Sequence, residues 1–250
     1  MGIAEVYLRS ICDMLAEIVG KEERKIDKAA ELLAEYVKQG KLIHVFGTGG
    51  HSTMGAMEVF WRAGGLASIN AIFPPGVSVS DSHPNTERLV GYAPIILKHY
   101  GVKEGDVLII INVNGINPLT IDTALEARKL GVKVIAITSP DFAKNVPPGI
   151  AARHPSNKNL HELADIVLDA HVPPGDAILK IEGLEQKVGP SSTFAVCFLA
   201  NLLMAKTVEK LVELGVEPPV WMSANVKGGD EFNTRYIEQY IGRVYHLYPM

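Results

Sequence analysis

The sequence lacks several features that mark specialised classes of protein. It contains only two cysteines in 250 residues, Cys12 and Cys197, and their separation matches no metal-binding spacing. So few cysteines are typical of a protein from a reducing compartment. No run of about 20 apolar residues occurs, so no membrane-spanning helix is expected. The first 25 residues lack the charged head, apolar centre and cleavage site of a signal peptide, so we expect a cytoplasmic protein.

Basic charge is also scarce. The formal net charge is −4, which argues against a nucleic-acid groove or an anionic membrane as the partner. No pair of histidines with an acidic residue has the spacing of metal ligands. We therefore predict no metal, no cofactor and no nucleic-acid or membrane partner.

What the sequence does contain is an alternation of strand and helix patterns from residue 41 to residue 170. The segment "GDVLIIINVNG" has five consecutive apolar residues, Val107 to Ile111, as in a central parallel strand covered on both faces. This order predicts an α/β fold of three layers, α/β/α, with a parallel sheet. Two helices, at about 2–19 and 22–39, come first. We predict a single domain over 1–250, with 1–40 as a helical extension.

The segment "HVFGTGGHS" follows the first predicted strand. Its glycines, among them Gly49 and Gly50, permit positive φ and close approach of the backbone to a ligand. The helix that follows would present N–H groups to an anion, and Ser52 adds a hydroxyl. The alternative is a tight turn with Ser52 or Thr53 as helix N-cap. The segment fits neither a Walker loop nor a dinucleotide fingerprint.

Two further polar segments lie where a strand ends or a helix begins, which is where open α/β sheets bind ligands. "NVNGINP" supplies Asn112, Asn114 and Asn117 after the central strand; asparagines there can also serve as a turn and a helix cap. "VGPSSTF" places three hydroxyls, Ser191 to Thr193, before a long helix. One hydroxyl suffices for a cap, so three in a row favour contact with a ligand.

These three segments, in this order and at these distances, resemble the sugar isomerase (SIS) domain family. Several long strings are similar to a group of stand-alone SIS proteins without an assigned reaction: "EVFWRAGGL", "GDVLIIINVNGIN", "PPGDA", "GLEQKVGPSST", "EPPVWMSANVKGGDE" and "ARHPSNKNLHELAD". The resemblance implies a flavodoxin-like parallel sheet that binds sugar phosphates. SIS phosphate loops carry hydroxyl residues where this chain has Asn112, Asn114 and Asn117, and an amide is longer than a hydroxyl and fits a different volume. The change leaves room for an uncharged or differently substituted sugar.

Isomerisation of a sugar needs a base and a group that stabilises an enediolate oxygen. The resemblance implies a glutamate from the helix after the glycine turn, here Glu58, although its register differs from the one expected. The alternative for Glu58 is an ion pair with Arg62 at i,i+4. His51 is the histidine best placed by sequence to act as an acid, a base or a hydrogen-bond donor; its alternative is a surface turn.

The long loop after the fourth predicted strand contains Arg153 and His154, which could cover the site and bind an anionic substrate. Their alternative is a solvated loop. Asp176, in "PPGDA", follows a glycine-marked turn and is interpreted as a cap or turn residue.

The resemblance favours a phosphosugar isomerase that moves a proton through an enediol. A non-catalytic sensor of a carbohydrate derivative and a lyase-type etherase are the alternatives. Because SIS sites are often shared between subunits, and the leading helices offer an apolar face, we expect a homodimer or homotetramer.

Overall fold

The computed structural model describes residues 2–80 and 83–249 of the chain. The strands are β1 (Ile43–Gly47), β2 (Ile69–Ile72), β3 (Val107–Ile111), β4 (Lys133–Thr138), β5 (Ile166–Asp169), β6 (Ala177–Leu179) and β7 (Val188–Pro190). The α-helices are α1 (Ile3–Lys38), α2 (Thr53–Val59), α3 (Ala93–His99), α4 (Pro118–Lys129), α5 (Pro140–Lys144), α6 (Leu160–Leu163), α7 (Ser192–Glu213) and α8 (Gly229–Tyr240), and a 3₁₀ helix, η1, spans Pro84–Arg88.

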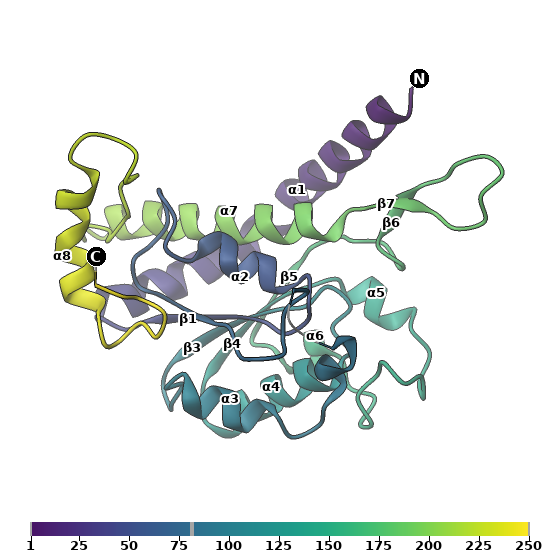
Figure 1. Cartoon of the computed structure of the whole chain (residues 1–250), viewed down its shortest axis with the longest axis horizontal. Coiled ribbons are helices and arrows are strands. Elements are labelled where there is room, and N and C mark those ends of the chain that lie inside the picture. The colour runs from purple at the N-terminus through teal and green to yellow at the C-terminus, as the bar shows by residue number, and fades with distance from the viewer. Residues whose placement is uncertain (1, 81–82, 250) are drawn as a thin grey trace.

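The sheet has the predicted flavodoxin-like topology. Its five strands are parallel and lie in the order β2-β1-β3-β4-β5. Helices α1, α2 and α7 cover one face, and α3, α4 and α6 cover the other (Figure 1). The predicted fold class is therefore confirmed, and the carboxyl ends of all five strands meet at one edge of the sheet, which we call the carboxyl rim.

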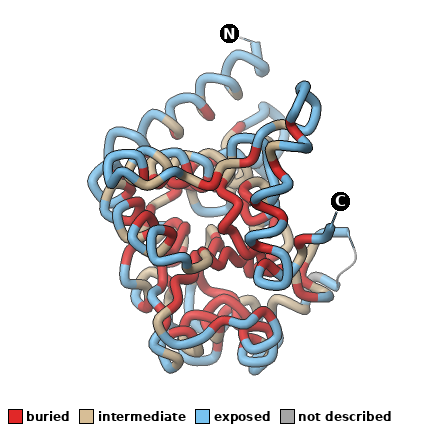
Figure 2. The backbone as a smooth tube through the Cα atoms, turned by 90° about the vertical axis from the view of Figure 1, so that its left-hand side faces the viewer, coloured by how far each residue is buried: buried red, intermediate tan, exposed pale blue. Residues whose placement is uncertain are grey.

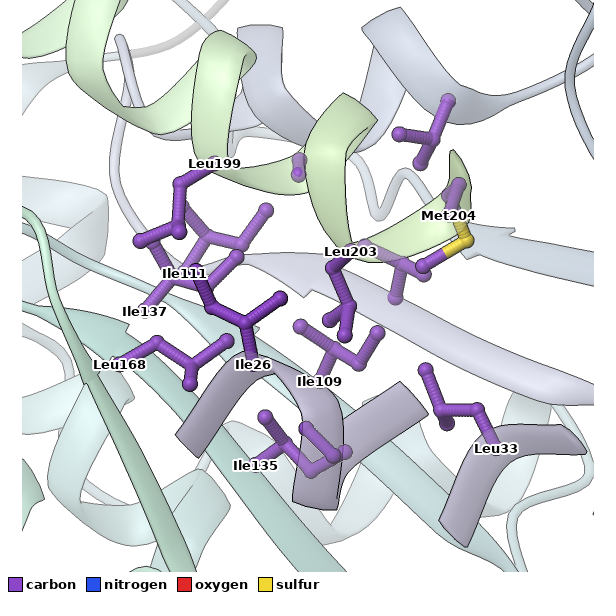
Figure 3. Close-up of a cluster of buried hydrophobic side chains, with 14 of the residues drawn as sticks. Ile26, Leu33, Ile109, Ile111, Ile135, Ile137, Leu168, Leu199, Leu203 and Met204 are labelled. Carbon is purple, nitrogen blue, oxygen red and sulfur yellow. The ribbon is translucent and has the colours of Figure 1, made fainter. Parts of the chain in front are cut away.

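Alternate residues along the strands point to opposite faces. Ile109 and Ile111 pack towards α1 and α7, while Leu108 and Ile110 pack towards α3 and α4. Figure 3 shows the first of these cores, in which Ile26 and Leu33 of α1 meet residues of α7 and the central strands. Because β3 is buried on both faces, its sequence is continuously apolar.

The prediction of two N-terminal helices is wrong, because α1 is one helix of 36 residues. A buried stripe runs through Met14, Ile18, Glu22 and Ile26 without interruption, and its packing against α7 and β5 outweighs the cost of Gly20 in the interior, about 1 kcal/mol. The first turns of α1 project from the body and are exposed (Figure 2).

Two other segments differ from the expected elements. The segment before β3, where the alternation of patterns leaves room for one helix, is divided into η1 and α3, with Gly91 between them at φ +85°. A two-stranded antiparallel hairpin, β6–β7, was not predicted. No helix in the described part of the chain combines the length and apolar character needed to cross a bilayer.

Candidate functional site

The turn after β1 is rich in glycine because other groups approach its backbone closely, and not because its backbone has an unusual conformation. None of Gly47, Gly49 and Gly50 has positive φ. A Cβ on Gly49 would lie 2.9 Å from Oε2 of Glu87 and 3.0 Å from Nδ2 of Asn112. Gly49 is therefore required because a carboxylate from η1 and an amide that follows β3 both contact this turn.

The start of α2 does not offer the N–H groups that the sequence predicted. The backbone N–H groups of Thr53, Met54 and Gly55 donate to the carbonyls of Gly49, His51 and Ser52. Helix α2 is also only seven residues long. Ser52 is its N-cap residue but makes no side-chain capping bond, so its hydroxyl is left at the carboxyl rim.

Glu87 is a site residue that the sequence analysis missed. Burial raises the pKa of its carboxyl, while a hydrogen bond from the backbone N–H of Gly50 and the charges of Arg88 and His51 act in the opposite direction. A raised pKa is suited to a group that must both accept and release a proton. The only sequence signal was an acidic residue in the polar stretch that follows the second strand.

The loop after β3 is held in shape by its own asparagines. Asn112 is buried, and its Oδ1 accepts the N–H of Gly115 at 2.8 Å. Oδ1 of Asn114 accepts the N–H of Ile116 at 3.2 Å. Nδ2 of Asn114 is left as a donor. Nδ2 of Asn112 lies beside the glycine turn; it donates one N–H to Oδ1 of Asn117 at 3.5 Å and keeps a second N–H. Asn117 is buried and donates to the carbonyl of Ala152 at 3.1 Å.

Asp176 binds the N-terminus of α7. Its Oδ1 accepts the N–H groups of Ser191 at 2.8 Å and Ser192 at 2.7 Å, and its Oδ2 accepts the hydroxyl of Ser192 at 2.8 Å. Asp176 has φ +66°, a conformation that non-glycine residues adopt only at a cost. Its interpretation as a cap agrees with these contacts, although the helix it caps begins 16 residues later.

These segments enclose one cavity at the carboxyl rim, which we call the rim cleft. It has a volume of about 230 Å³ and is lined by Gly49, Gly50, His51, Ser52, Glu87, Asn112, Val113, Asn114, Phe142, Asp176, Ser192, Thr193 and Val196. Eight of the predicted site residues lie in this set: Gly49, Gly50, His51, Ser52, Asn112, Asn114, Ser192 and Thr193. A second cavity of about 400 Å³ adjoins the cleft and shares Gly50, His51 and Glu87 with it.

The other predicted site residues lie outside this lining. Glu58 forms an ion pair with Arg62 at 3.0 Å and accepts a bond from Asn201 at 3.0 Å, as its alternative interpretation stated. Asn117 and Ser191 are buried behind the cleft and hold its walls.

Arg153 and His154 are buried rather than solvated, and they stabilise the long loop. Arg153 donates to the carbonyls of Ala143 at 2.7 Å and Val146 at 2.9 Å. His154 Nε2 lies 3.1 Å from Asp122. With these donors engaged inside the protein, neither residue lines the cleft.

Comparisons with known proteins agree with this architecture. A family profile described as "SIS domain" matches residues 6–139. A UPF0309 protein of Shouchella clausii is 38% identical over 252 residues, covering 99% of this chain and 100% of its own. A UPF0309 protein of Oceanobacillus iheyensis is 36% identical with the same coverage. Among solved structures, phosphoheptose isomerase from Neisseria gonorrhoeae superposes with a TM-score of 0.51 at 17% identity, over 83% of this chain and 96% of that one.

Proposed function

This chain belongs to the SIS domain family and groups with the UPF0309 proteins, and from this premise we propose that it isomerises a carbohydrate derivative bound in the rim cleft. One observation carries the proposal: four segments distant in sequence, at 49–52, 87, 112–114 and 192–193, line one polar cavity at the carboxyl rim. Ligands of open α/β sheets bind at this edge. A small hollow rich in hydroxyls, amides and carboxylates matches the many hydroxyl groups of a sugar.

The proposed reaction transfers a proton between two adjacent carbons of the sugar through an enediol. Glu87 is the proposed base, since its carboxyl is in the cleft and burial raises its pKa towards the working range of a base. It takes the proton from one carbon and returns it to the next. His51 lines the same cleft; it is proposed to donate a proton to the carbonyl oxygen of the sugar and to take the proton of the neighbouring hydroxyl when the new carbonyl forms. The Nδ2 groups of Asn112 and Asn114 are proposed to stabilise the developing enediolate.

The phosphoheptose isomerase with the same fold supports proton-transfer chemistry on a sugar as the reaction class. Glu87 replaces Glu58 as the proposed base, because Glu58 faces Arg62 and Asn201 rather than the cleft. The difference between these two glutamates can be measured directly.

The test is a thermal-shift screen of aldoses, ketoses and their derivatives, followed by proton exchange in heavy water for each stabilising compound. We expect one C–H of the bound sugar to become C–D, as seen by NMR. Glu87→Gln should slow this exchange by about 10²- to 10⁴-fold, the usual contribution of a positioned acid–base group. Glu58→Gln should keep most of the exchange rate. Glu35→Gln, an exposed change near the end of α1, is the matched control.

Two outcomes would contradict this proposal. A ligand that stabilises the protein but never exchanges a proton would identify a carbohydrate sensor instead. Loss of exchange in Glu58→Gln but not in Glu87→Gln would return the catalytic role to the helix after the glycine turn.

We also propose that the chain forms a homodimer or homotetramer. Ile3 and Leu8, on the projecting turns of α1, are 54% and 63% exposed, which is costly for apolar side chains in a monomer. Leu8→Glu should lower the mass measured by sedimentation equilibrium, whereas Glu35→Gln should not. A wild-type protein that sediments as a monomer at high concentration would contradict this.

A further inference from the structure

The segment that carries Glu87 is not anchored by the hydrophobic core. Among the described side chains from residue 85 to residue 90 none is buried, and Leu89 and Val90 are 52% and 60% exposed. A base has to stay within hydrogen-bond reach of the proton that it removes, so polar contacts must hold this segment in place. One of these contacts is the hydrogen bond from the N–H of Gly50 to the carboxyl of Glu87.

A second polar contact lies at the other end of the segment and comes from α4. Oδ2 of Asp122 accepts the N–H of Gly91 at 2.6 Å. Gly91 has φ +85°, and it is the point at which the chain turns between η1 and α3. The side chain of Asp122 is 14% exposed, and a hydrogen bond to a carboxylate is stronger than one between neutral groups. Asp122 therefore fixes where the chain leaves η1.

The same carboxyl group also binds the long loop between β4 and β5. Its Oδ1 lies 3.1 Å from Nε2 of His154. Nδ1 of His154 accepts the N–H of Ser156 at 3.1 Å, so Nε2 carries the proton and donates it to Asp122. His154 is buried. Its backbone N–H donates to the carbonyl of Ile116 at 2.8 Å, in the loop after β3 that supplies the amide donors of the cleft.

Asp122 thus joins two walls of the rim cleft that are distant in sequence. We infer that Asp122 is a positioning residue, which sets the distance between the carboxyl of Glu87 and the loop after β3, with His154 as the partner that orients it. Asp122 does not line the cleft, so it acts through Glu87 and not on the sugar. This inference rests on the proposed function, in which Glu87 is the base.

The first test needs no sugar, because it follows the titration of Glu87 by NMR of its carboxyl carbon. Burial raises the pKa of Glu87 above 4.5. Asp122→Ala removes the acceptor of the Gly91 N–H, so η1 should move outwards and the pKa of Glu87 should fall towards 4.5. Asp122→Asn keeps an oxygen for this N–H and should retain most of the raised pKa.

Both substitutions remove the charge of Asp122, so the difference between them measures the hydrogen bond to Gly91. Glu126→Gln removes a charge from the same helix, where Glu126 is paired with Lys129. This matched control should leave the titration of Glu87 unchanged.

The second test uses the ligand found in the screen and separates binding from proton transfer. Asp122→Ala should slow proton exchange by about 10²-fold, since a displacement of about 1 Å can cost that much, while the dissociation constant should change much less. In a Glu87→Gln background the same substitution should slow exchange no further, because the base that it positions is already absent. A purely structural role would lower the exchange rate in both backgrounds.

The contact with His154 is tested by two milder variants. Asp122→Asn keeps an acceptor for Gly91 but loses the carboxylate oxygen that faces Nε2 of His154, so it should slow exchange less than Asp122→Ala does. His154→Ala should act in the same direction. If Asp122→Ala does not fold, as judged by circular dichroism, an exchange rate in Asp122→Asn equal to that of the wild type would overturn the inference.

The outcomes separate this inference from the proposed function. If Glu87→Gln does not slow exchange, the proposed base is wrong and the inference fails with it. If Glu87→Gln slows exchange but Asp122→Ala does not, the inference is overturned while the proposed function stands. A folded Asp122→Ala variant in which Glu87 titrates as in the wild type would overturn the inference without any ligand.

Discussion

The two ends of the parallel sheet each place a carboxyl group beside a cavity, with Asp106 buried and Glu87 half-buried, and the two groups differ in their hydrogen bonds. At the carboxyl rim, Glu87 lines the rim cleft, and the net effect of its surroundings is a raised pKa. At the opposite end, Asp106 lies beside a cavity of about 400 Å³. Burial would raise the pKa of Asp106, but hydrogen bonds from His44 and from the N–H of Lys103 lower it overall.

The polar cluster around Asp106 is satisfied by the protein itself. Asn70 donates to Nδ1 of His44 at 3.0 Å and to the carbonyl of Tyr100 at 3.1 Å, and its own oxygen accepts the N–H of Tyr245 at 2.9 Å. Because Nδ1 of His44 accepts, Nε2 carries the proton, and it lies 3.3 Å from Asp106. The comparison teaches that a cavity alone does not indicate function. What sets the rim cleft apart from this cavity is the carboxyl of Glu87, whose pKa burial raises by more than its donors lower it.

The largest effect is expected from removing the carboxyl of Asp106, at the end of the sheet where the polar groups are hydrogen-bonded to one another. Asp106→Ala leaves the buried donors of His44 and Lys103 without their acceptor, which costs about 2–3 kcal/mol of unfolding free energy. Denaturant unfolding at pH 7 measures this cost, and one cooperative transition is expected for the predicted single domain. Ligand affinity at the rim cleft should not change. A loss of affinity equal to that of a cleft variant would remove the distinction between the two ends.

The loss of unfolding free energy in Asp106→Ala should depend on pH, and the lowered pKa of Asp106 sets the direction. A carboxyl with a lowered folded pKa stabilises the protein above its unfolded pKa, here near 3.8, and this contribution disappears as pH falls through the folded value. The difference between wild type and Asp106→Ala should therefore be full at pH 7 and shrink below about pH 4. A difference that grows in acid would contradict the assignment.

A smaller effect is expected from adding one methyl group at the cleft. Gly49→Ala would place Cβ within 3.0 Å of both Glu87 and Asn112, so one of them must shift, at a cost of about 1–3 kcal/mol for an overpacked site. Ligand affinity and proton exchange should both fall by about tenfold or more. Gly20→Ala is the matched control, since its Cβ meets nothing within 4 Å and should add about 0.5–1 kcal/mol of stability in a helix interior.

The smallest effect concerns Glu87, for which the dependence of stability on pH should have the opposite sign to that of Asp106. The folded pKa of Glu87 is raised above its ordinary 4.5 by burial, so its contribution to stability is full below that value and is lost as pH rises through the folded pKa. Glu87→Gln should therefore be as stable as wild type or more stable at pH 7–8, with the difference vanishing in acid. Because the side chain is partly exposed, solvent keeps this below about 1 kcal/mol. Thermal unfolding between pH 4 and pH 8 measures it, and a variant less stable at pH 8 would contradict the burial argument.

Much of the fold could be predicted from the sequence because it depends on patterns within each segment. The five apolar residues from Val107 to Ile111 identified the central strand, and the alternation of strand and helix patterns identified the parallel sheet. The single helix α1 was missed because Gly20 and a shift of apolar register look like a break. Only the packing against α7 and β5 shows that the helix continues.

The candidate site was less predictable because its chemistry depends on which segments meet. The residues of the glycine turn and of the asparagine loop were found by their position after strands. Glu87 was not, since nothing in η1 alone shows that its carboxyl reaches Gly49 across the rim. The i,i+4 spacing offered Arg62 as a partner of Glu58 but could not decide between the ion pair and the site, and the structure shows the ion pair. Nothing in the sequence shows that Arg153 donates to the carbonyl of Ala143, which holds it away from the cleft.

The central claim is that one cavity at the carboxyl rim binds the carbohydrate. Its most direct test is an NMR titration of the backbone amides with the tightest-binding sugar of the screen. We predict that the signals of Gly50, Asn114 and Thr193 move together with one dissociation constant, while those near His44 and Asp106 stay still. Shifts concentrated at the opposite end of the sheet, or different constants for the three amides, would contradict the account.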